Sequence, residues 1–162
     1  MNVNTRPFKL LIFDWEGTLA FPGSSPSRLY PDTVVVLSAL KEQGYLLAVA
    51  TAKSKQGLAQ DLHRLNLHTL ISATCTAEET HPKPNPEMVF NILNQLAIVP
   101  QDALMIGDTV FDLDMARQAK IKSVAVTYGL QTREELLTYG PCTCVDELTQ
   151  LPLWLAQLGT NT

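Results

Sequence analysis

Cysteine is scarce in this sequence: the three that occur, Cys75, Cys142 and Cys144, make an odd number and lack the spacing of a disulfide framework. Long hydrophobic runs are missing too, since no apolar stretch approaches the roughly 20 residues of a membrane-spanning helix. The first apolar run, Leu10–Phe13, is too short for the core of a signal peptide and ends at an acidic residue. We therefore expect a soluble, cytoplasmic protein with reduced thiols.

Charged residues are few, at 17% of the chain, and Lys and Arg number 12 against 16 Asp and Glu, for a net charge of −4. Disorder would need more charge and less than the 46% hydrophobic content found here. Because no basic run occurs, we expect neither nucleic-acid binding nor binding to an anionic membrane. A length of 162 residues predicts a single domain, 1–162, that buries its core without disulfide or metal support.

Short apolar segments alternate with amphipathic ones along the chain. Apolar runs typical of buried parallel strands cover 9–13, 45–50, 70–72, 103–106 and 123–127. Apolar residues at a period of three to four predict helices over 31–43, 54–65, 86–96 and 110–119, with Pro31 as the first helical residue of its segment. Thr132 and Glu135 form a capping box before a short helix, and Pro152 interrupts a helical tail over 146–158. This alternation predicts a Rossmann-like, three-layer α/β/α sandwich with a mostly parallel sheet.

Polar residues follow several of the predicted strands directly. Asp14 and Glu16 come after the first strand, Thr51 after the second, and Asp108 after the strand at 103–106. Ligands of such folds bind beyond the carboxyl ends of the strands, which lie at one edge of the sheet. Carboxylates that share this edge repel one another unless a cation lies between them. The sequence therefore predicts a metal site at this edge.

Four segments, IFDWEGTLA, AVATAKS, HPKPNP and MIGDTVFDLDMA, resemble the motifs of the haloacid dehalogenase-like hydrolase superfamily in order and spacing. From Leu29 to Leu155 the chain further resembles the phosphoglycolate phosphatase group of that superfamily. The resemblance implies a Mg²⁺-dependent phosphomonoester hydrolase that works through an aspartyl-phosphate intermediate.

The resemblance also implies a role for each acidic motif residue. Asp14 matches the nucleophile, which as a carboxylate needs no prior deprotonation at neutral pH. Asp108 matches the metal-binding acid, which would share Mg²⁺ with Asp14 and the backbone carbonyl of Glu16. Asp112 matches the acid that holds either the waters of the metal or the lysine. Oxygen ligands of this kind suit Mg²⁺.

Three further residues match the phosphate-binding positions of the family. Thr51 and the amide of Ala52 match the donors to phosphate oxygens, and Lys83 matches the lysine that neutralises the phosphoryl group. Pro82 and Pro84 flank this lysine and restrict its backbone to extended forms. Positioned donors and cations around the transferred group are what phosphoryl transfer requires.

Two features depart from the family pattern. The family has an aspartate two residues after the nucleophile, as general acid and then base, whereas this chain has Glu16 with one more methylene. Capped relatives carry an inserted domain after the first motif, whereas only the eleven residues Ala20–Tyr30 are available here. We therefore expect a capless enzyme acting on a phosphorylated small molecule or a bulkier phosphorylated substrate. Its open site favours either a homo-oligomer or a bulky substrate that excludes water.

Two other hypotheses remain at this point. Glu16 and the missing cap leave open a catalytically weak or silent family member that acts as a binding or scaffold protein. A dehalogenase also uses an aspartate nucleophile, but Asp108 and Asp112 with Lys83 fit Mg²⁺ and phosphoryl chemistry better.

For the three cysteines and His81 we predict no role in binding a metal ion. Cys142 and Cys144 form a lone CxC pair in the setting of a strand end, and His81 is expected on a surface loop. Cys75 is expected to be a small buried hydrophobic residue.

Overall fold

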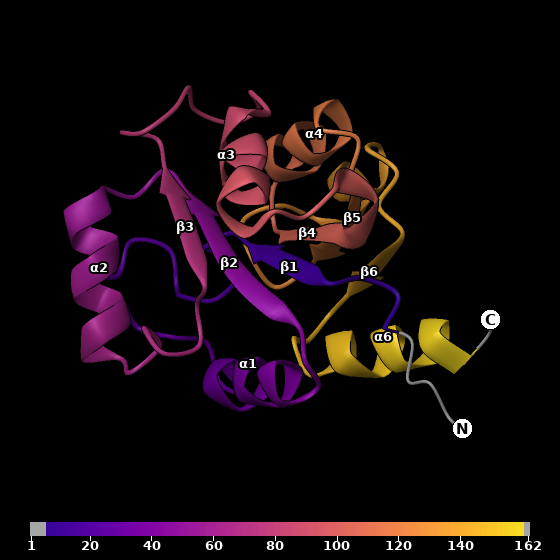
Figure 1. Cartoon of the computed structure of the whole chain (residues 1–162), viewed down its shortest axis with the longest axis horizontal. Coiled ribbons are helices and arrows are strands. Elements are labelled where there is room, and N and C mark those ends of the chain that lie inside the picture. Colours follow the sequence, from indigo (N-terminus) through magenta and orange to yellow (C-terminus); the bar gives the residue numbers. More distant parts are fainter. Residues whose placement is uncertain (1–5, 161–162) are drawn as a thin grey trace.

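The computed structural model describes residues 6–160 and contains a six-stranded sheet in the order β3-β2-β1-β4-β5-β6 (Figure 1). All neighbouring strands pair in parallel, which confirms the predicted Rossmann-like α/β sandwich. The strands are β1 (Leu10–Phe13), β2 (Leu46–Thr51), β3 (Ala73–Thr76), β4 (Ala103–Gly107), β5 (Lys122–Val126) and β6 (Thr143–Val145). The helices are α1 (Thr33–Glu42), α2 (Lys55–Arg64), α3 (Glu87–Leu96), α4 (Val110–Gln118), α5 (Arg133–Leu137) and α6 (Gln150–Thr160), with a 3₁₀ turn at Pro100–Asp102.

The two faces of the sheet carry two separate hydrophobic cores. Leu11 and Phe13 of β1 pack into the core that α1, α2 and α6 cover. Leu10 and Ile12 point the other way, into the core under α3 and α4. Successive strand residues face opposite sides, so a strand covered on both faces is apolar throughout, as the LLIF run of β1 is. The helices above and below the sheet in Figure 1 complete the three layers.

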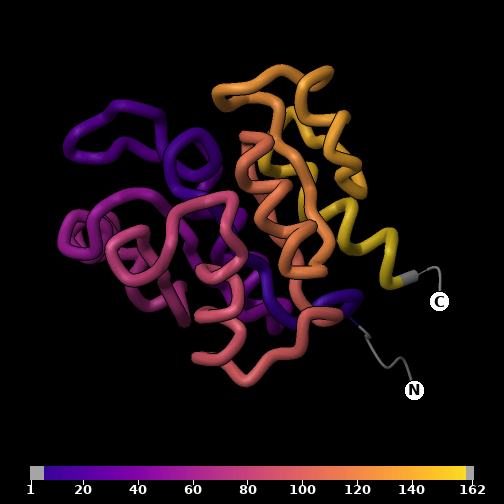
Figure 2. Tube along the Cα trace, turned by 90° about the horizontal axis from the view of Figure 1, so that it is seen from above, coloured from indigo at the N-terminus to yellow at the C-terminus, as the bar shows by residue number. Residues whose placement is uncertain are grey.

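The order of the strands reverses between β1 and β4. The chain adds β2 and β3 on one side of β1, and α3 then returns it to the other side, where β4, β5 and β6 follow. Figure 2 shows the result from above, with early segments on one side and the last third on the other. Phe13 pairs with Ile106, so the residues that follow these two strands leave the sheet side by side. Ligand crevices form at such a switch point.

The third strand lies three residues later than predicted, at Ala73–Thr76 instead of 70–72. The amides of Leu70 and Ile71 donate to the carbonyl of Leu67, so these apolar residues form a turn that packs against the core. The strand itself has small residues, Ala73 and Cys75, beneath α3. The most hydrophobic residues of this region therefore form the turn, whereas the small residues that pack closely beneath α3 form the strand.

Both proline-based predictions of helix limits are wrong. Helix α1 begins at Thr33, because Asp32 adopts a left-handed conformation (φ 70°) and the Thr33 hydroxyl donates to the carbonyl of Leu19 at 3.1 Å. Helix α6 runs through Pro152, which is its third residue. First-turn amides have no acceptor within the helix, so a proline there removes no hydrogen bond.

Local capping signals are confirmed. The Ser54 hydroxyl accepts from the amide of Gly57 at the start of α2, and the capping box of Thr132 and Glu135 opens α5. Residues 14–32 connect β1 to α1 as a loop in which Ala20 bridges Leu29, and no inserted domain occurs there. Within residues 6–160, no helix has the length and apolar character to cross a membrane.

Candidate active site

Three buried carboxylates meet at the switch point of the sheet. Asp14 follows β1, Asp108 follows β4, and Asp112 lies in the first turn of α4. One oxygen of each lies within 4.8 Å of the others. The predicted convergence of Asp14 and Asp108 is therefore confirmed, and Asp112 joins them from the helix.

Asp108 is fixed by the backbone that surrounds it. One carboxylate oxygen accepts from the Thr18 hydroxyl at 3.2 Å, and the other accepts from the amide of Leu130 at 3.0 Å. Gly17 and Gly129 pass so close that a Cβ on either would overlap the Asp108 side chain, and Gly17 has a positive φ of 87°. Glycine is required at these two positions because the chain closes over the carboxylate.

Asp112 is fixed by the cap of its own helix. One carboxylate oxygen accepts from the amides of Asp108 and Thr109, at 3.2 and 3.1 Å, in a capping box that begins α4. The other oxygen faces Lys83, whose ammonium lies 2.6 Å away. The sequence left open whether Asp112 faces metal-bound water or the lysine, and in the structure it contacts the lysine.

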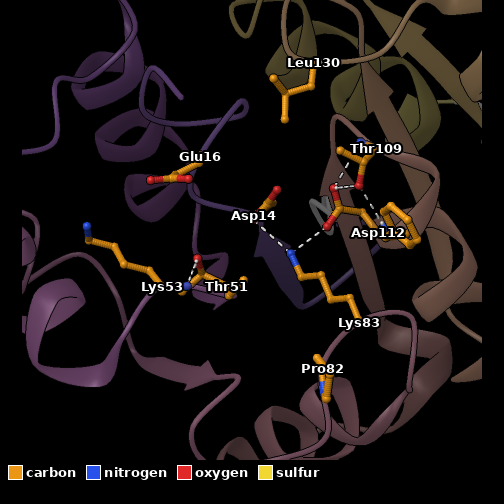
Figure 3. Close-up of a pocket in the computed structure, with 11 residues that line it drawn as sticks. Asp14, Glu16, Thr51, Lys53, Pro82, Lys83, Thr109, Asp112 and Leu130 are labelled. Carbon is orange, nitrogen blue, oxygen red and sulfur yellow. Dashed lines mark hydrogen bonds and ion pairs between the residues drawn. The ribbon is translucent and has the colours of Figure 1, made fainter. Parts of the chain in front are cut away.

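Lys83 reaches the cluster from the loop between β3 and α3 (Figure 3). Its Nζ lies 2.9 Å from Oδ1 of Asp14 and 2.6 Å from Oδ1 of Asp112. Burial by itself lowers the pKa of Lys83, but the charges of Asp112 and Asp14 outweigh burial and leave the pKa above its ordinary value. The side chain therefore stays cationic at neutral pH.

One ammonium does not balance three carboxylates. Burial raises the pKa of Asp14 well above its ordinary value, and the charge of Asp112 raises it further against the opposing effect of Lys83. Burial also raises the pKa of Asp108, although the amide of Leu130 opposes it. Among the described residues, Lys83 is the only cation paired with this cluster. A buried, all-oxygen donor set with excess negative charge fits a hard divalent cation such as Mg²⁺.

A pocket of about 390 Å³ opens above this cluster. Thr51, the last residue of β2, is buried at its floor, and its hydroxyl oxygen accepts from the amide of Lys53 at 3.1 Å, which leaves the O–H available as a donor. Asp108 lies beneath the surface and does not line the pocket. The lining residues are Asp14, Glu16, Thr51, Ala52, Lys53, Pro82, Lys83, Thr109, Phe111, Asp112 and Leu130. The structure thus brings every site residue proposed from the sequence into or directly under one pocket.

Glu16 differs from the other acids because it is exposed. In Figure 3 it lies on the Lys53 side of Asp14, at the edge of the pocket. Its exposed position leaves Glu16 accessible to water and to a bound substrate, whereas the three buried acids are held by fixed partners.

Several residues that line the pocket or hold its acids were not predicted from the sequence. Thr18 lies inside the first motif, and Lys53 follows the motif residues Thr51 and Ala52, so their proximity could have indicated them. Leu130 lies after β5, outside every motif, and only the fold brings its backbone to Asp108.

The three cysteines and His81 lie in the positions expected of them. Cys75 is fully buried among apolar side chains. Cys142 is exposed just before β6, which contains Cys144. His81 is exposed on a loop, where it pairs with Glu87.

Comparison with known proteins places this fold in a family. Residues 24–126 match the model of the haloacid dehalogenase-like hydrolases. The chain belongs to this family. The matched span contains Thr51, Lys83, Asp108 and Asp112 but begins after Asp14, so the position of Asp14 rests on the geometry above.

Curated relatives of the chain are named as phosphatases. It is 34% identical over 128 residues to the probable phosphatase IndB of Dickeya dadantii, which is 78% of this chain and 56% of that protein. It is 31% identical over 133 residues to the pyrophosphatase PpaX of Bacillus anthracis, or 82% of this chain and 62% of that one. The chain thus spans about 56 to 62% of the length of these relatives.

Solved structures share the fold at lower identity. A predicted phosphoglycolate phosphatase from Haemophilus somnus superposes with a TM-score of 0.81 at 20% identity, covering 91% of this chain and 98% of that one. A predicted phosphatase from Clostridium acetobutylicum gives 0.83 at 20% identity, with coverages of 93% and 99%. Both confirm the architecture of this member of the haloacid dehalogenase-like hydrolases.

Proposed function

We propose that the protein is a Mg²⁺-dependent phosphomonoester hydrolase that works through an aspartyl-phosphate on Asp14. The observation that carries the proposal is the cluster of three buried carboxylates with one paired lysine at the floor of an open pocket. The name of the relative IndB, a probable phosphatase, supports this proposal, and the name of the pyrophosphatase PpaX supports the more general transfer of a phosphoryl group to water.

In the first step, a carboxylate oxygen of Asp14 attacks phosphorus and the bond from phosphorus to the ester oxygen breaks. Glu16 donates a proton to the departing oxygen, so the alcohol leaves neutral. Lys83, the Thr51 hydroxyl and the Ala52 amide bind the oxygens of the transferred group, where negative charge is spread in the transition state.

In the second step, Glu16, now deprotonated, accepts a proton from a water that attacks the aspartyl-phosphate. The bond from phosphorus to the Asp14 oxygen breaks, inorganic phosphate leaves, and both side chains return to their starting states. An acyl phosphate suits this role because water hydrolyses it readily.

The residues that would hold Mg²⁺ are Asp14, Asp108 and the backbone carbonyl of Glu16, with Asp112 beside them. When bound, Mg²⁺ neutralises charge on the phosphoryl oxygens and on the carboxylates. Asp112 meanwhile keeps Lys83 directed at Asp14, through the 2.6 Å ion pair described above. The lysine is therefore oriented before substrate arrives.

A second candidate function is binding without turnover, as a scaffold. The observation that favours it is Glu16, which is longer than the aspartate of the family and lies exposed at the pocket edge. A displacement of about 1 Å in a catalytic group can lower the rate about 100-fold.

Hydrolysis of p-nitrophenyl phosphate, with Mg²⁺ and then with excess EDTA, separates the two functions. We expect turnover with Mg²⁺ that EDTA abolishes, and none in the Asp14→Asn variant. Thermal unfolding in the same two buffers tests the metal directly: at 100 times its dissociation constant, Mg²⁺ should stabilise the fold by about 2.7 kcal/mol. A Mg²⁺-dependent rise in Tm without turnover on phosphate monoesters or pyrophosphate would favour the scaffold.

A further inference from the structure

Two large apolar side chains line the pocket and remain exposed. Phe111 is 56% exposed and Leu130 is 65% exposed, and both belong to the pocket wall. In Figure 3 the side chain of Leu130 points from the far rim of the pocket toward Asp14. We call these two residues the apolar wall. An apolar surface that faces the phosphoryl site is available to contact the leaving group of a substrate.

Leu130 is held in this position by its own backbone. Its amide donates to Asp108 at 3.0 Å, and Gly129 before it passes against the same carboxylate. The backbone that carries this side chain therefore cannot move away from the pocket without breaking a hydrogen bond to a buried carboxylate, and such a bond contributes more than a neutral one.

Phe111 is held by its neighbours in α4. Asp112 beside it is turned inward by the capping box, so Phe111 takes the outer side of the first turn. The amide of Val110 donates to the side-chain oxygen of Gln131, which ties the start of α4 to the segment that carries Leu130. The backbone segments that carry the apolar wall are thus held in place before a ligand binds, so that little backbone entropy is lost on binding.

The charged groups of the pocket do not favour an anionic leaving group. Lys53 pairs with Asp61 at 3.2 Å, and Lys83 is shared by Asp14 and Asp112. Glu16 adds a further carboxylate at the edge. A second phosphate or carboxylate in the leaving group would lie against the apolar wall or against Glu16. Neither contact compensates for the water that the anion gives up on binding.

We infer that the apolar wall selects phosphate monoesters whose leaving group is an apolar alcohol, alkyl or aryl, over esters with an anionic leaving group. This inference rests on the proposed hydrolase function and names its substrate class. Phe111 and Leu130 are then specificity-determining residues, since their contact with the leaving group adds to kcat/KM without touching the phosphoryl group.

A series of straight-chain alkyl phosphates, from ethyl to hexyl, provides the test. The alcohols of this series have nearly equal acidity, so only contact area changes with chain length. We expect kcat/KM of the wild type to rise about twofold to fourfold per added methylene until the wall is covered. Leu130→Ala and Phe111→Ala should flatten this rise, so that the ratio of kcat/KM for hexyl phosphate to kcat/KM for ethyl phosphate falls about tenfold.

Leu153→Ala is the matched control, because Leu153 is also 65% exposed but lies on α6 and outside the pocket. It should leave the chain-length dependence unchanged. Mg²⁺-dependent hydrolysis of p-nitrophenyl phosphate with a flat or falling alkyl series, or with a preference for pyrophosphate, would overturn the inference and leave the proposed function standing.

Binding separates the inference from the chemistry if no ester is hydrolysed. Calorimetry with ethyl- and hexylphosphonate in Mg²⁺ measures the contact of the wall directly. Tighter binding of the longer phosphonate, with a negative heat-capacity change that Leu130→Ala reduces, supports the wall even in an inactive protein. Equal affinity for the two phosphonates would overturn it.

Discussion

A single buried aspartate on α2 and the cluster of three at the switch point have opposite electrostatic environments. Asp61 on α2 is buried, yet hydrogen bonds from Ser27, Arg64 and Lys53 outweigh burial and hold its pKa below the usual value. At the switch point, burial and mutual repulsion raise the pKa of Asp14 and of Asp108 against a single lysine. Burial alone therefore does not decide the state of a carboxylate; the number of partners does. Asp61 serves the fold, whereas the cluster is left short of positive charge and suits a cation and a phosphoryl group.

The largest expected effect in this comparison is that of Asp14→Asn on catalysis. Loss of the nucleophile should lower kcat with p-nitrophenyl phosphate by about 1,000-fold or more. In EDTA the same variant should unfold at a higher temperature than the wild type, because it removes a charge that burial and Asp112 destabilise by more than the pairing with Lys83 offsets. Steady-state kinetics and thermal unfolding measure the two effects. Activity near that of the wild type would exclude the covalent mechanism.

Glu16 extends the comparison to an exposed carboxylate. Glu16→Gln keeps the length of the side chain and removes its proton, so kcat with an alkyl phosphate should fall about 100-fold, within the range of acid–base catalysis. Glu16→Asp restores the residue type of the family but shortens the side chain. We expect a slower enzyme with the native substrate, because the shorter side chain at the pocket edge would not reach the leaving oxygen as closely as Glu16 does. Unchanged rates in Glu16→Gln would remove Glu16 from the mechanism and return the scaffold function to consideration.

Asp61→Asn should have the opposite effect on stability to Asp14→Asn. Its loss leaves Lys53 and Arg64 without their carboxylate partner, at distances of 3.2 and 3.1 Å in the native protein. Because Arg64 is partly exposed and screened by solvent, we expect a loss of about 2 kcal/mol, less than for a fully buried pair. Urea denaturation of the two variants in EDTA measures the contrast. If Asp14→Asn and Asp61→Asn both stabilised the protein, or both destabilised it, the contrast between the two sites would be wrong.

The smallest expected effect is the change with pH in the stability differences between each variant and the wild type. Asp14 has a folded-state pKa above its ordinary value of 3.8, so its charge destabilises the fold at neutral pH, and this penalty disappears as pH falls through the raised pKa. The advantage of Asp14→Asn in EDTA should therefore shrink on acidification. Asp61 has a lowered pKa, so its stabilisation is complete above 3.8 and is lost as pH falls below that value. Unfolding of both variants from pH 7 to pH 3 checks the order of the two changes.

Much of the fold could be predicted because its signals are local. Runs such as LLIF in β1, the Ser54 cap and the capping box of Thr132 act within a few residues, and the structure has each of them. The errors arose where distant contacts decided the outcome. Thr33 begins α1 because it reaches the carbonyl of Leu19, and strand β3 follows the close packing of α3 instead of the apolar residues before it.

By itself, the sequence determined the alternation of strands and helices and the acids that follow the strands. The parallel sheet then had to collect Asp14, Thr51 and Asp108 at one edge, because carboxyl ends of parallel strands point the same way. Only the tertiary structure decided that Asp112 contacts Lys83, that Asp61 pairs with two cations, and that Leu130 lines the pocket. These outcomes depend on side chains from separate elements meeting in space. Leu130 is 22 residues from Asp108 in the chain, yet its amide is bonded to that carboxylate.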